Sequence, residues 1–188
     1  MTILIAGLVI FFAVHLARVV APGWRERQAT AHPGAWKGLY ALASLIGFAL
    51  IVWGWIVWRP EAPQLYVPPS WGRHAAMLLV PLGLIAIAAA YQPAGRIRAT
   101  LQHPFLVGIM LWALAHLLAN GDLAGVLVFG SFLAYGLVDI VAALGRPARV
   151  GFATWRGDAV AVTAGIVLTA ALVLGLHQTL FGVSPLAG

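Results

Sequence analysis

Six long apolar stretches, separated by short polar segments, form the main pattern along this chain. A helix needs about 20 predominantly apolar residues to span the hydrocarbon core of a membrane, and most of the stretches approach that length. They are Ile3–Val20, Gly38–Trp58, Trp71–Tyr91, Pro104–Ala119, Leu123–Leu144 and Ala159–Phe181. The pattern predicts an all-α, polytopic membrane helix bundle with about six transmembrane helices, forming a single domain over residues 1–188.

The segments between the apolar stretches contain residues typical of loops. The fourth and fifth stretches are joined only by Asn120-Gly-Asp122, which predicts a tight antiparallel hairpin with Asp122 as the N-cap of the fifth helix. The remaining connections all contain proline, and we expect them to be loops. They are Ala21–Lys37, Arg59–Ser70, Gln92–His103 and Gly145–Asp158.

Composition supports the membrane assignment. Of the 188 residues, 62% are hydrophobic and only 9% are charged, whereas a soluble domain carries about 25% charged residues. The mean hydropathy is +0.96. The net charge of +6 comes from basic residues that flank the apolar stretches, and no basic patch is interleaved with exposed aromatic residues. We therefore expect the partner to be a lipid bilayer and exclude nucleic-acid binding.

The basic residues also predict the orientation of the chain. Nine of the eleven Lys and Arg residues fall on one side of the expected spans, and only Arg59 and Arg73 fall on the other. Loops rich in Lys and Arg remain cytoplasmic, so we expect a multi-pass protein of the inner membrane with both termini in the periplasm. No Lys or Arg precedes the first stretch, which favours a retained helix over a cleaved signal peptide. The nine residues are Arg18, Arg25, Arg27, Lys37, Arg96, Arg98, Arg146, Arg149 and Arg156.

The chain has no cysteine, which excludes thiolate nucleophiles, iron–sulfur clusters and Cys-ligated zinc. A metal or heme would have to be held by His, Met, carboxylate or Tyr. The sequence also lacks a Gly-rich phosphate loop, a His-Glu-x-x-His zinc motif and a Gly-x-Ser-x-Gly elbow. Whether the protein is an enzyme therefore stays open.

Six histidines and one acid are the candidates for chemistry inside the membrane. His74, His116 and His177 lie within about 3–6 Å of the outer ends of three different spans, by the helix rise. His15 and Asp139 lie about 7 Å from the cytoplasmic end of theirs. Histidine is a common heme-iron ligand, and intramembrane ionisable residues are functional candidates by default. The alternative is that each histidine faces headgroups or water.

Two of these residues have further alternatives. Asp139 either handles protons or forms a salt bridge with Arg18 or Arg146. On the first helix, His15 and Arg18 share a face, so that Arg18 could meet a heme propionate while His15 meets the iron.

The fourth stretch carries His103 at its start and His116 near its end. These two are separated by about 20 Å along a helix and point to different faces, so they cannot bind one metal together. Gly108, Trp112 and His116 share a face, which would suit a flat porphyrin and would equally suit helix packing. We expect His103 to begin the helix, with Pro104 in its first turn.

Several sequence blocks resemble the NnrU family, bacterial membrane proteins associated with denitrification and nitric oxide metabolism. That family is in turn related to 15-cis-zeta-carotene isomerase. The spacing His-Pro-x-x-x-Gly also resembles that of isoprenylcysteine-type membrane methyltransferases, but Gln102 replaces the Arg usual there. The blocks that resemble NnrU proteins are Ala13-Val-His-Leu16, His103-Pro-x-x-x-Gly108, Leu111-Trp-Ala-Leu-Ala-His116, Asn120-Gly-Asp122 and Gly130-Ser-Phe-Leu-Ala-Tyr135.

The resemblance implies a heme b site with His15 and His116 as the iron ligands. It implies a redox or nitric-oxide-linked role. A second possibility is heme-dependent cis–trans isomerisation of a carotenoid-like polyene, and a third is a heme-free binding or assembly factor. We expect Arg18 and Trp112 to contact the cofactor.

His103 and Asp139 are then candidates for catalytic support next to the heme, through hydrogen bonding or proton handling. Depth along the helices conflicts with the implied ligand pair and favours His116 with His74 or His177. We follow the resemblance and expect His15 and His116 as the ligands, with His74 and His177 as the alternatives.

Overall fold

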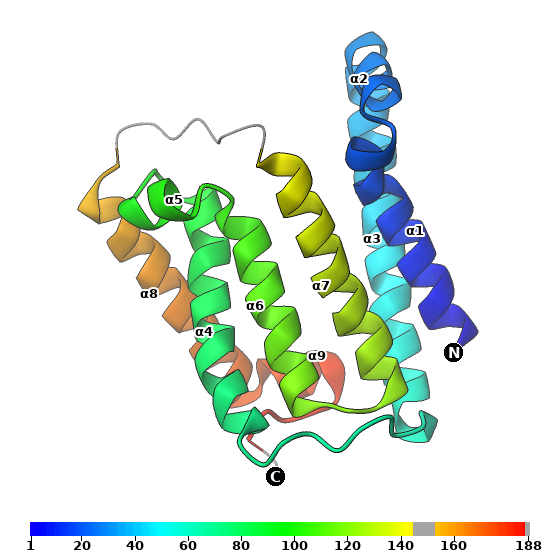
Figure 1. Cartoon of the computed structure of the whole chain (residues 1–188), viewed down its shortest axis with the longest axis vertical. Helices are drawn as coiled ribbons and strands as arrows, with labels where there is room; N and C mark the ends of the chain where they lie inside the picture. The colour runs from blue at the N-terminus through cyan, green and yellow to red at the C-terminus, as the bar shows by residue number, and fades with distance from the viewer. Residues whose placement is uncertain (145–152, 187–188) are drawn as a thin grey trace.

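The computed structural model describes residues 1–144 and 153–186, and the elements in these ranges are helical. The first apolar stretch forms α1, and the fourth and fifth form α6 and α7, with Asn120–Asp122 between them (Figure 1). The elements in chain order are α1 (Thr2–Val20), α2 (Pro22–Ala31), α3 (Pro33–Trp58), the 3-10 turn η1 (Arg59–Glu61), α4 (Gly72–Tyr91), α5 (Arg96–Leu101), α6 (Pro104–Ala119), α7 (Leu123–Ala143), α8 (Trp155–Ala171), the π-helical turn η2 (Leu172–Leu176) and α9 (His177–Phe181).

The predicted membrane helix bundle is confirmed. Within the described residues, five segments are long and apolar enough to cross a membrane: α1, α3 with η1, α4, α7, and α8 continued through α9. The remaining apolar helix, α6, has only 16 residues, which corresponds to about 24 Å at the usual helix rise. It is therefore shorter than the hydrocarbon core of a typical bilayer, which is about 30 Å thick.

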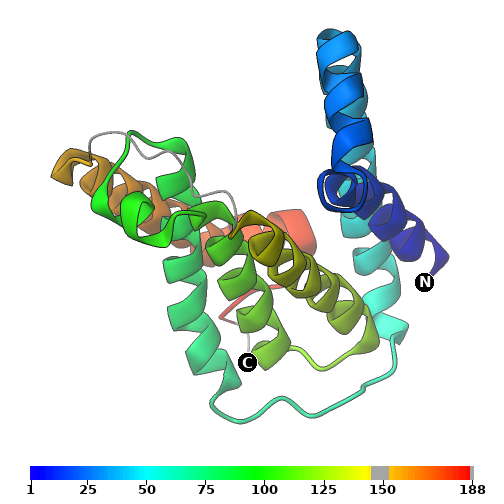
Figure 2. The same cartoon turned by 45° about the horizontal axis from the view of Figure 1, so that its top comes forward.

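The long helices follow one another along a curved layer, in the order α8, α4, α6, α7 and then the α1–α3 pair (Figures 1 and 2). The closest packing is between α4 and α6, α1 and α3, α4 and α8, and α6 and α7. Helices α2 and α5 lie at one end of the layer, and both chain termini lie toward the other end. This grouping agrees with the predicted sidedness, whereas the compartment on each side stays a prediction.

Glycine explains how two of these pairs come so close. A Cβ atom on Gly47 would lie 2.7 Å from the backbone N of Phe11, between α3 and α1. A Cβ atom on Gly108 would lie 2.5 Å from the carbonyl oxygen of Gly83, between α6 and α4. Small residues allow such backbone contact between membrane helices. Gly108 therefore serves helix packing, which was one of its two expected roles.

Two of the segments expected to be loops contain helices, so that prediction was wrong in part. Residues 21–37 form α2 and the start of α3, and residues 92–103 contain α5. The prolines at positions 22 and 33 stand in the first turns of α2 and α3, where a missing N–H does no harm. Trp24 packs edge-on against Trp36, with ring centroids 5.5 Å apart, and fixes α2 against α3.

The loop between α7 and α8 lies partly outside the described residues, and with it Arg146 and Arg149. The helix after it begins at Trp155, four residues before the predicted Ala159, because the Thr154 side chain caps its N-terminus by accepting from the Gly157 N–H.

An extended segment after η1 fastens the end of α3 to the turn between α6 and α7. The Leu65 N–H donates to the Gly121 carbonyl (2.8 Å), and the Leu123 N–H donates to the Pro63 carbonyl (2.9 Å). The Asp122 carboxylate accepts from the Gly125 N–H at 2.7 Å, which confirms its predicted role as N-cap of α7.

Tyr66 completes this fastening. Its hydroxyl donates to the Leu117 and Asn120 carbonyls, the latter at 2.8 Å. Burial, and then the negative charge of Asp122, raise the pKa of the Tyr66 phenol. The phenol therefore keeps its proton, and the two hydrogen bonds persist, at neutral and mildly alkaline pH.

The apolar core lies where α1, α3, α6 and α7 meet. Its buried members include Leu4 and Leu8 from α1, Ile51 from α3, and Phe129 and Phe132 from α7. The aromatic rings in it form edge-to-face and tilted contacts that such rings favour. This core separates two groups of polar side chains, one at each end of the bundle.

Candidate functional site

The structure places the candidate residues at two opposite ends of the bundle. His15, Arg18, His103 and Asp139 line one cavity, whereas Trp112 and His116 lie further along α6. His103 and His116 are thirteen residues apart, which is about 20 Å at the helix rise. The structure therefore brings four of the expected residues together and sets His116 apart from them.

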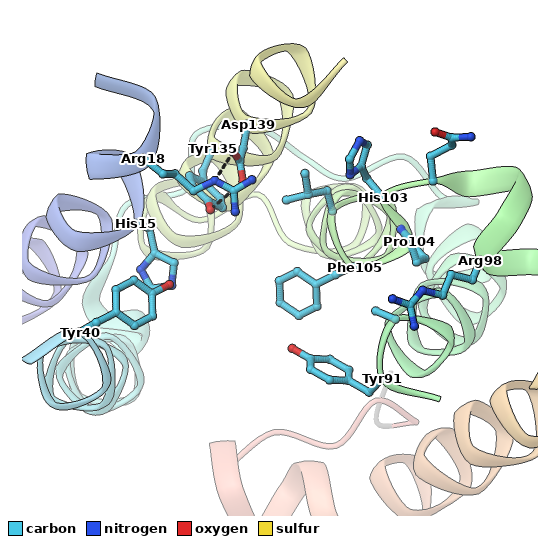
Figure 3. Close-up of a pocket in the computed structure, with 13 residues that line it drawn as sticks. His15, Arg18, Tyr40, Tyr91, Arg98, His103, Pro104, Phe105, Tyr135 and Asp139 are labelled. Atoms are coloured by element: carbon cyan, nitrogen blue, oxygen red, sulfur yellow. Dashed lines mark hydrogen bonds and ion pairs between the residues drawn. The ribbon is translucent and has the colours of Figure 1, made fainter. Parts of the chain in front are cut away.

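The cavity has a volume of about 390 Å³ and lies between the ends of several helices (Figure 3). His15 and Tyr40 stand on one side of it, and Tyr91 and Phe105 face them from the other. The lining residues are His15, Arg18, Tyr40, Ala90, Tyr91, Arg98, Gln102, His103, Pro104, Phe105, Leu106, Tyr135 and Asp139.

Sequence reasoning missed Tyr40, Tyr91, Arg98 and Tyr135 as members of this site. Tyr135 had a detectable signal, because it precedes Asp139 by four residues and therefore shares its helix face. The other three come from α3, α4 and α5. No local pattern connects these helices to His15, so only the tertiary arrangement could identify them.

Asp139 is the charged group most deeply buried in the cavity wall, with a side-chain exposure of 0%. Its Oδ1 lies 3.0 Å from Arg18 Nε, and its Oδ2 accepts a hydrogen bond from the Tyr135 hydroxyl at 2.9 Å (Figure 3). The predicted salt bridge with Arg18 is thus confirmed, while Arg146 lies outside the described residues. A buried carboxylate needs such a partner, because an unpaired charge is costly in a low-dielectric environment.

Only one of the two ring nitrogens of His15, Nδ1, makes a hydrogen bond to another described residue. Its Nδ1 donates to the Phe11 carbonyl at 2.7 Å, and since a carbonyl can only accept, Nδ1 carries the proton. The ring stacks on Phe11 with centroids 4.0 Å apart and lies 5.1 Å from the Tyr40 ring. In the neutral tautomer Nε2 is therefore a free acceptor or metal ligand.

His116, at the other end, has the same arrangement. Its Nδ1 donates to the Trp112 carbonyl at 2.7 Å, and its ring stacks on Phe129 at 4.4 Å. His177 lies beside it, with ring centroids 6.4 Å apart and ring planes inclined by 20°. The Nδ1 of His177 donates to the Val183 carbonyl at 2.6 Å. Two imidazoles with available Nε2 atoms are thus neighbours at this end.

A break in the last apolar stretch positions His177. The sequence predicted one helix over Ala159–Phe181, but α8 ends at Ala171 and the π turn follows. Gly175 has φ +148° and ψ −23°, a conformation that side chains rarely allow. The break starts the short α9 behind the lower ends of α6 and α7 (Figure 1). His177 at its first position then meets His116.

The remaining candidates make fewer contacts. His74 is exposed at the start of α4 and, among the described residues, makes no hydrogen bond or ring contact. His103 is partly buried at the start of α6 and lines the cavity. Trp112 belongs to the core, because its ring meets Phe129 and Phe132 edge-on. It also lies 5.0 Å from the His116 ring.

The histidines meet one chemical condition for holding a heme. Within the described residues, no group of three or more His, Cys, Asp or Glu side chains could hold a metal ion. Zinc sites usually need three or four protein ligands, whereas a heme takes only axial ligands from the protein. A histidine ligand typically donates its other ring N–H to a carbonyl or carboxylate. His15, His116 and His177 all satisfy that condition.

Comparison with known proteins agrees with the resemblance found in the sequence. The family model described as NnrU protein matches residues 3–185. No curated protein and no solved structure matches the chain. The match covers both the cavity and the His116–His177 pair.

Proposed function

Because the chain belongs to the NnrU protein family, we propose that it is a heme b-binding membrane protein with a redox or nitric-oxide-linked role. The iron ligands in this proposal are His116 and His177. One observation carries it: the two rings lie 6.4 Å apart, and each Nδ1 is fixed by a backbone carbonyl. In this proposal the Nε2 atom of each ring would bind the iron.

This pairing selects one of the two expected from the sequence. His15 lines the cavity with His103, whereas His116 lies about 20 Å beyond His103 along α6 by the helix rise. The rings of Phe11, Phe132 and Trp112 lie between His15 and His116, so these two histidines would bind one iron only after the helices rearranged. Arg18 lies with His15 and is paired with Asp139. It would therefore not reach the propionates of a heme on His116.

The residues around His116 support a heme in several ways. Phe129 and Trp112 pack against its imidazole and provide an apolar wall that keeps water from the iron. Asn120 Nδ2 donates to the His116 carbonyl at 2.9 Å and steadies the end of α6. When bound, heme b would supply a one-electron redox couple, and a small diatomic ligand could bind there by displacing one of the two histidines.

The spectrum of the purified protein tests the proposal. Protein from heme-replete cells should show a Soret band, and reduction should give the spectrum of a low-spin heme with two histidine ligands. His116→Ala and His177→Ala should each abolish that spectrum, whereas His74→Ala, an exposed matched control, should keep it. No Soret band in the wild type would exclude the heme. Loss in His15→Ala with retention in His177→Ala would restore the pairing that the resemblance implies.

Two assays on the loaded protein separate the possible roles. Titration of the reduced protein with nitric oxide should shift the Soret band, as expected for a nitric-oxide-linked role. Incubation with 15-cis polyenes followed by isomer analysis tests the isomerase alternative. Conversion that depends on His116 would favour that alternative over the redox role.

A further inference from the structure

The cavity lined by His15 and Asp139 lies at the other end of the bundle from the proposed heme at His116 and His177. This cavity holds a buried carboxylate, an imidazole with a free Nε2 and three tyrosines in about 390 Å³. Small-molecule sites are typically concave, of this size or larger, and lined by aromatic residues with a few polar groups. The arrangement is therefore that of a binding site.

The cavity lining contains two cations, Arg18 and Arg98, and one anion, Asp139. Asp139 is completely buried and already balances Arg18. A second anion beside this carboxylate would experience repulsion at low dielectric. Arg98 is the other cation in the lining, and its Nη1 donates to the Gln92 carbonyl at 3.3 Å. Its remaining N–H groups can donate to a neutral oxygen at the cavity edge.

The walls of the cavity favour a flat ring. His15 and Tyr40 on one side face Phe105 and Tyr91 on the other, and the Tyr91 hydroxyl points toward the space between them (Figure 3). An aromatic ring packs favourably between such faces. The ring needs oxygens that can both accept from a tyrosine or Arg98 and donate to His15 Nε2.

The location favours a ligand that is dissolved in the bilayer. The cavity lies near the ends of membrane-spanning helices, with His15 five residues from the end of α1 and Tyr91 at the end of α4. A ligand with a polar ring and an apolar tail can place the ring here while its tail remains in lipid. These conditions together describe the hydroquinone form of the lipid-soluble quinone redox carriers.

We propose that the cavity lined by His15, Tyr40, Tyr91, Arg98 and Phe105 binds the ring of a membrane hydroquinone. His15 Nε2 accepts a hydrogen bond from a ring hydroxyl, and Arg98 donates to the oxygen on the opposite side. The Asp139–Arg18 pair holds α1 and α7 together at the cavity wall. The choice of a redox carrier rests on the proposed redox role, but binding of the ring does not require heme.

Binding of decylubiquinol, the reduced form that carries ring hydroxyls, to the purified protein in detergent under anaerobic conditions tests this inference. The wild type should bind it saturably, after correction for partition into empty micelles. His15→Phe keeps an aromatic ring but removes both nitrogens, and loss of one hydrogen bond should raise the Kd by about tenfold. His74→Phe is the same exchange at an exposed histidine outside the cavity and should leave the Kd unchanged.

A second variant shows whether lost binding in His15→Phe could come from misfolding. Ala90→Phe fills the cavity without removing a polar group, and it should also abolish binding. Absence of saturable binding in the wild type, or equal Kd values for His15→Phe and His74→Phe, would overturn the inference. Binding of phosphatidylglycerol in the cavity together with no binding of decylubiquinol would identify a lipid headgroup site and would overturn the inference too.

The design separates this inference from the heme proposal. His116→Ala should lose the heme spectrum and still bind decylubiquinol with the wild-type Kd. A Soret band without decylubiquinol binding would contradict only the inference about the cavity. Decylubiquinol binding without a Soret band would contradict only the heme.

Discussion

The ion pair between Arg18 and Asp139 gives the sharpest prediction for stability. Arg18→Met removes the guanidinium and keeps most of the aliphatic stem, so that Asp139 becomes a buried carboxylate with only the Tyr135 hydroxyl as partner. Breaking a buried ion pair in this way typically costs about 3–5 kcal/mol. The stability of the folded protein should therefore fall measurably.

We expect the loss of stability in Arg18→Met to lie at the lower end of that range or below it. Asp139 is 0% exposed, but the Arg18 side chain is 44% exposed, so solvent screens part of the interaction. At the separation of 3.0 Å, an effective dielectric constant of about 20 gives an attraction of about 5 kcal/mol before any desolvation is subtracted. We expect Arg18→Met to destabilise the protein by about 1–3 kcal/mol.

A double-mutant cycle isolates the charge effect. In Arg18→Met combined with Asp139→Asn, no charge remains buried, and the amide can still accept from Tyr135. The double variant should therefore recover most of the loss. Unfolding by SDS, followed by tryptophan fluorescence in mixed micelles, measures each free energy. A double variant no more stable than Arg18→Met would show that the guanidinium contributes through packing and not through its charge, and would refute the reasoning.

Two further predictions concern the segments that position His116 and His177. Gly175→Ala places a side chain at φ +148°, which should destabilise α9 by more than about 1 kcal/mol and lower the heme-to-protein ratio. Gly130→Ala, in a helical position with open space around it, is the control, and equal heme content in both would contradict the proposed role of the break. Tyr66→Phe removes two hydrogen bonds to α6 and should cost about 1 kcal/mol. Because the folded-state pKa of Tyr66 is raised, the difference from wild type should be constant below the unfolded-state phenol pKa of about 10 and disappear as the pH rises through the folded-state value. A difference that disappears already near neutral pH would exclude the hydroxyl as its source.

The positions of the apolar helices, the tight turn and the salt bridge could be predicted from the sequence alone. These features depend mainly on residues that are close together in the chain or at similar depth in the membrane. Hydropathy defines where the apolar helices lie, since a backbone in lipid must satisfy its hydrogen bonds within its own segment. The tight turn and the Asp122 cap follow from three consecutive residues. The salt bridge of Asp139 was also expected, because a buried acid needs a cation at similar depth.

The segments that were predicted incorrectly show where local reasoning ends. Proline suggested loops at residues 21–37, but it also stands in the first turn of a helix, and only the packing of Trp24 on Trp36 favours that outcome. Likewise, residues 159–181 read as one uniform apolar helix. Hydropathy carries no information about the backbone of Gly175, so the break was not predictable.

The tertiary structure decided which polar groups meet. Depth along a helix can be computed from the sequence, but the direction a residue faces relative to other helices depends on how those helices pack. Packing brings Tyr40, Tyr91 and Arg98 to His15. The break at Gly175 brings His177 to His116. His15, on α1, lies at the opposite end of the bundle. The candidate histidines were visible in the sequence, and their pairing depends on contacts between helices that are distant along the chain.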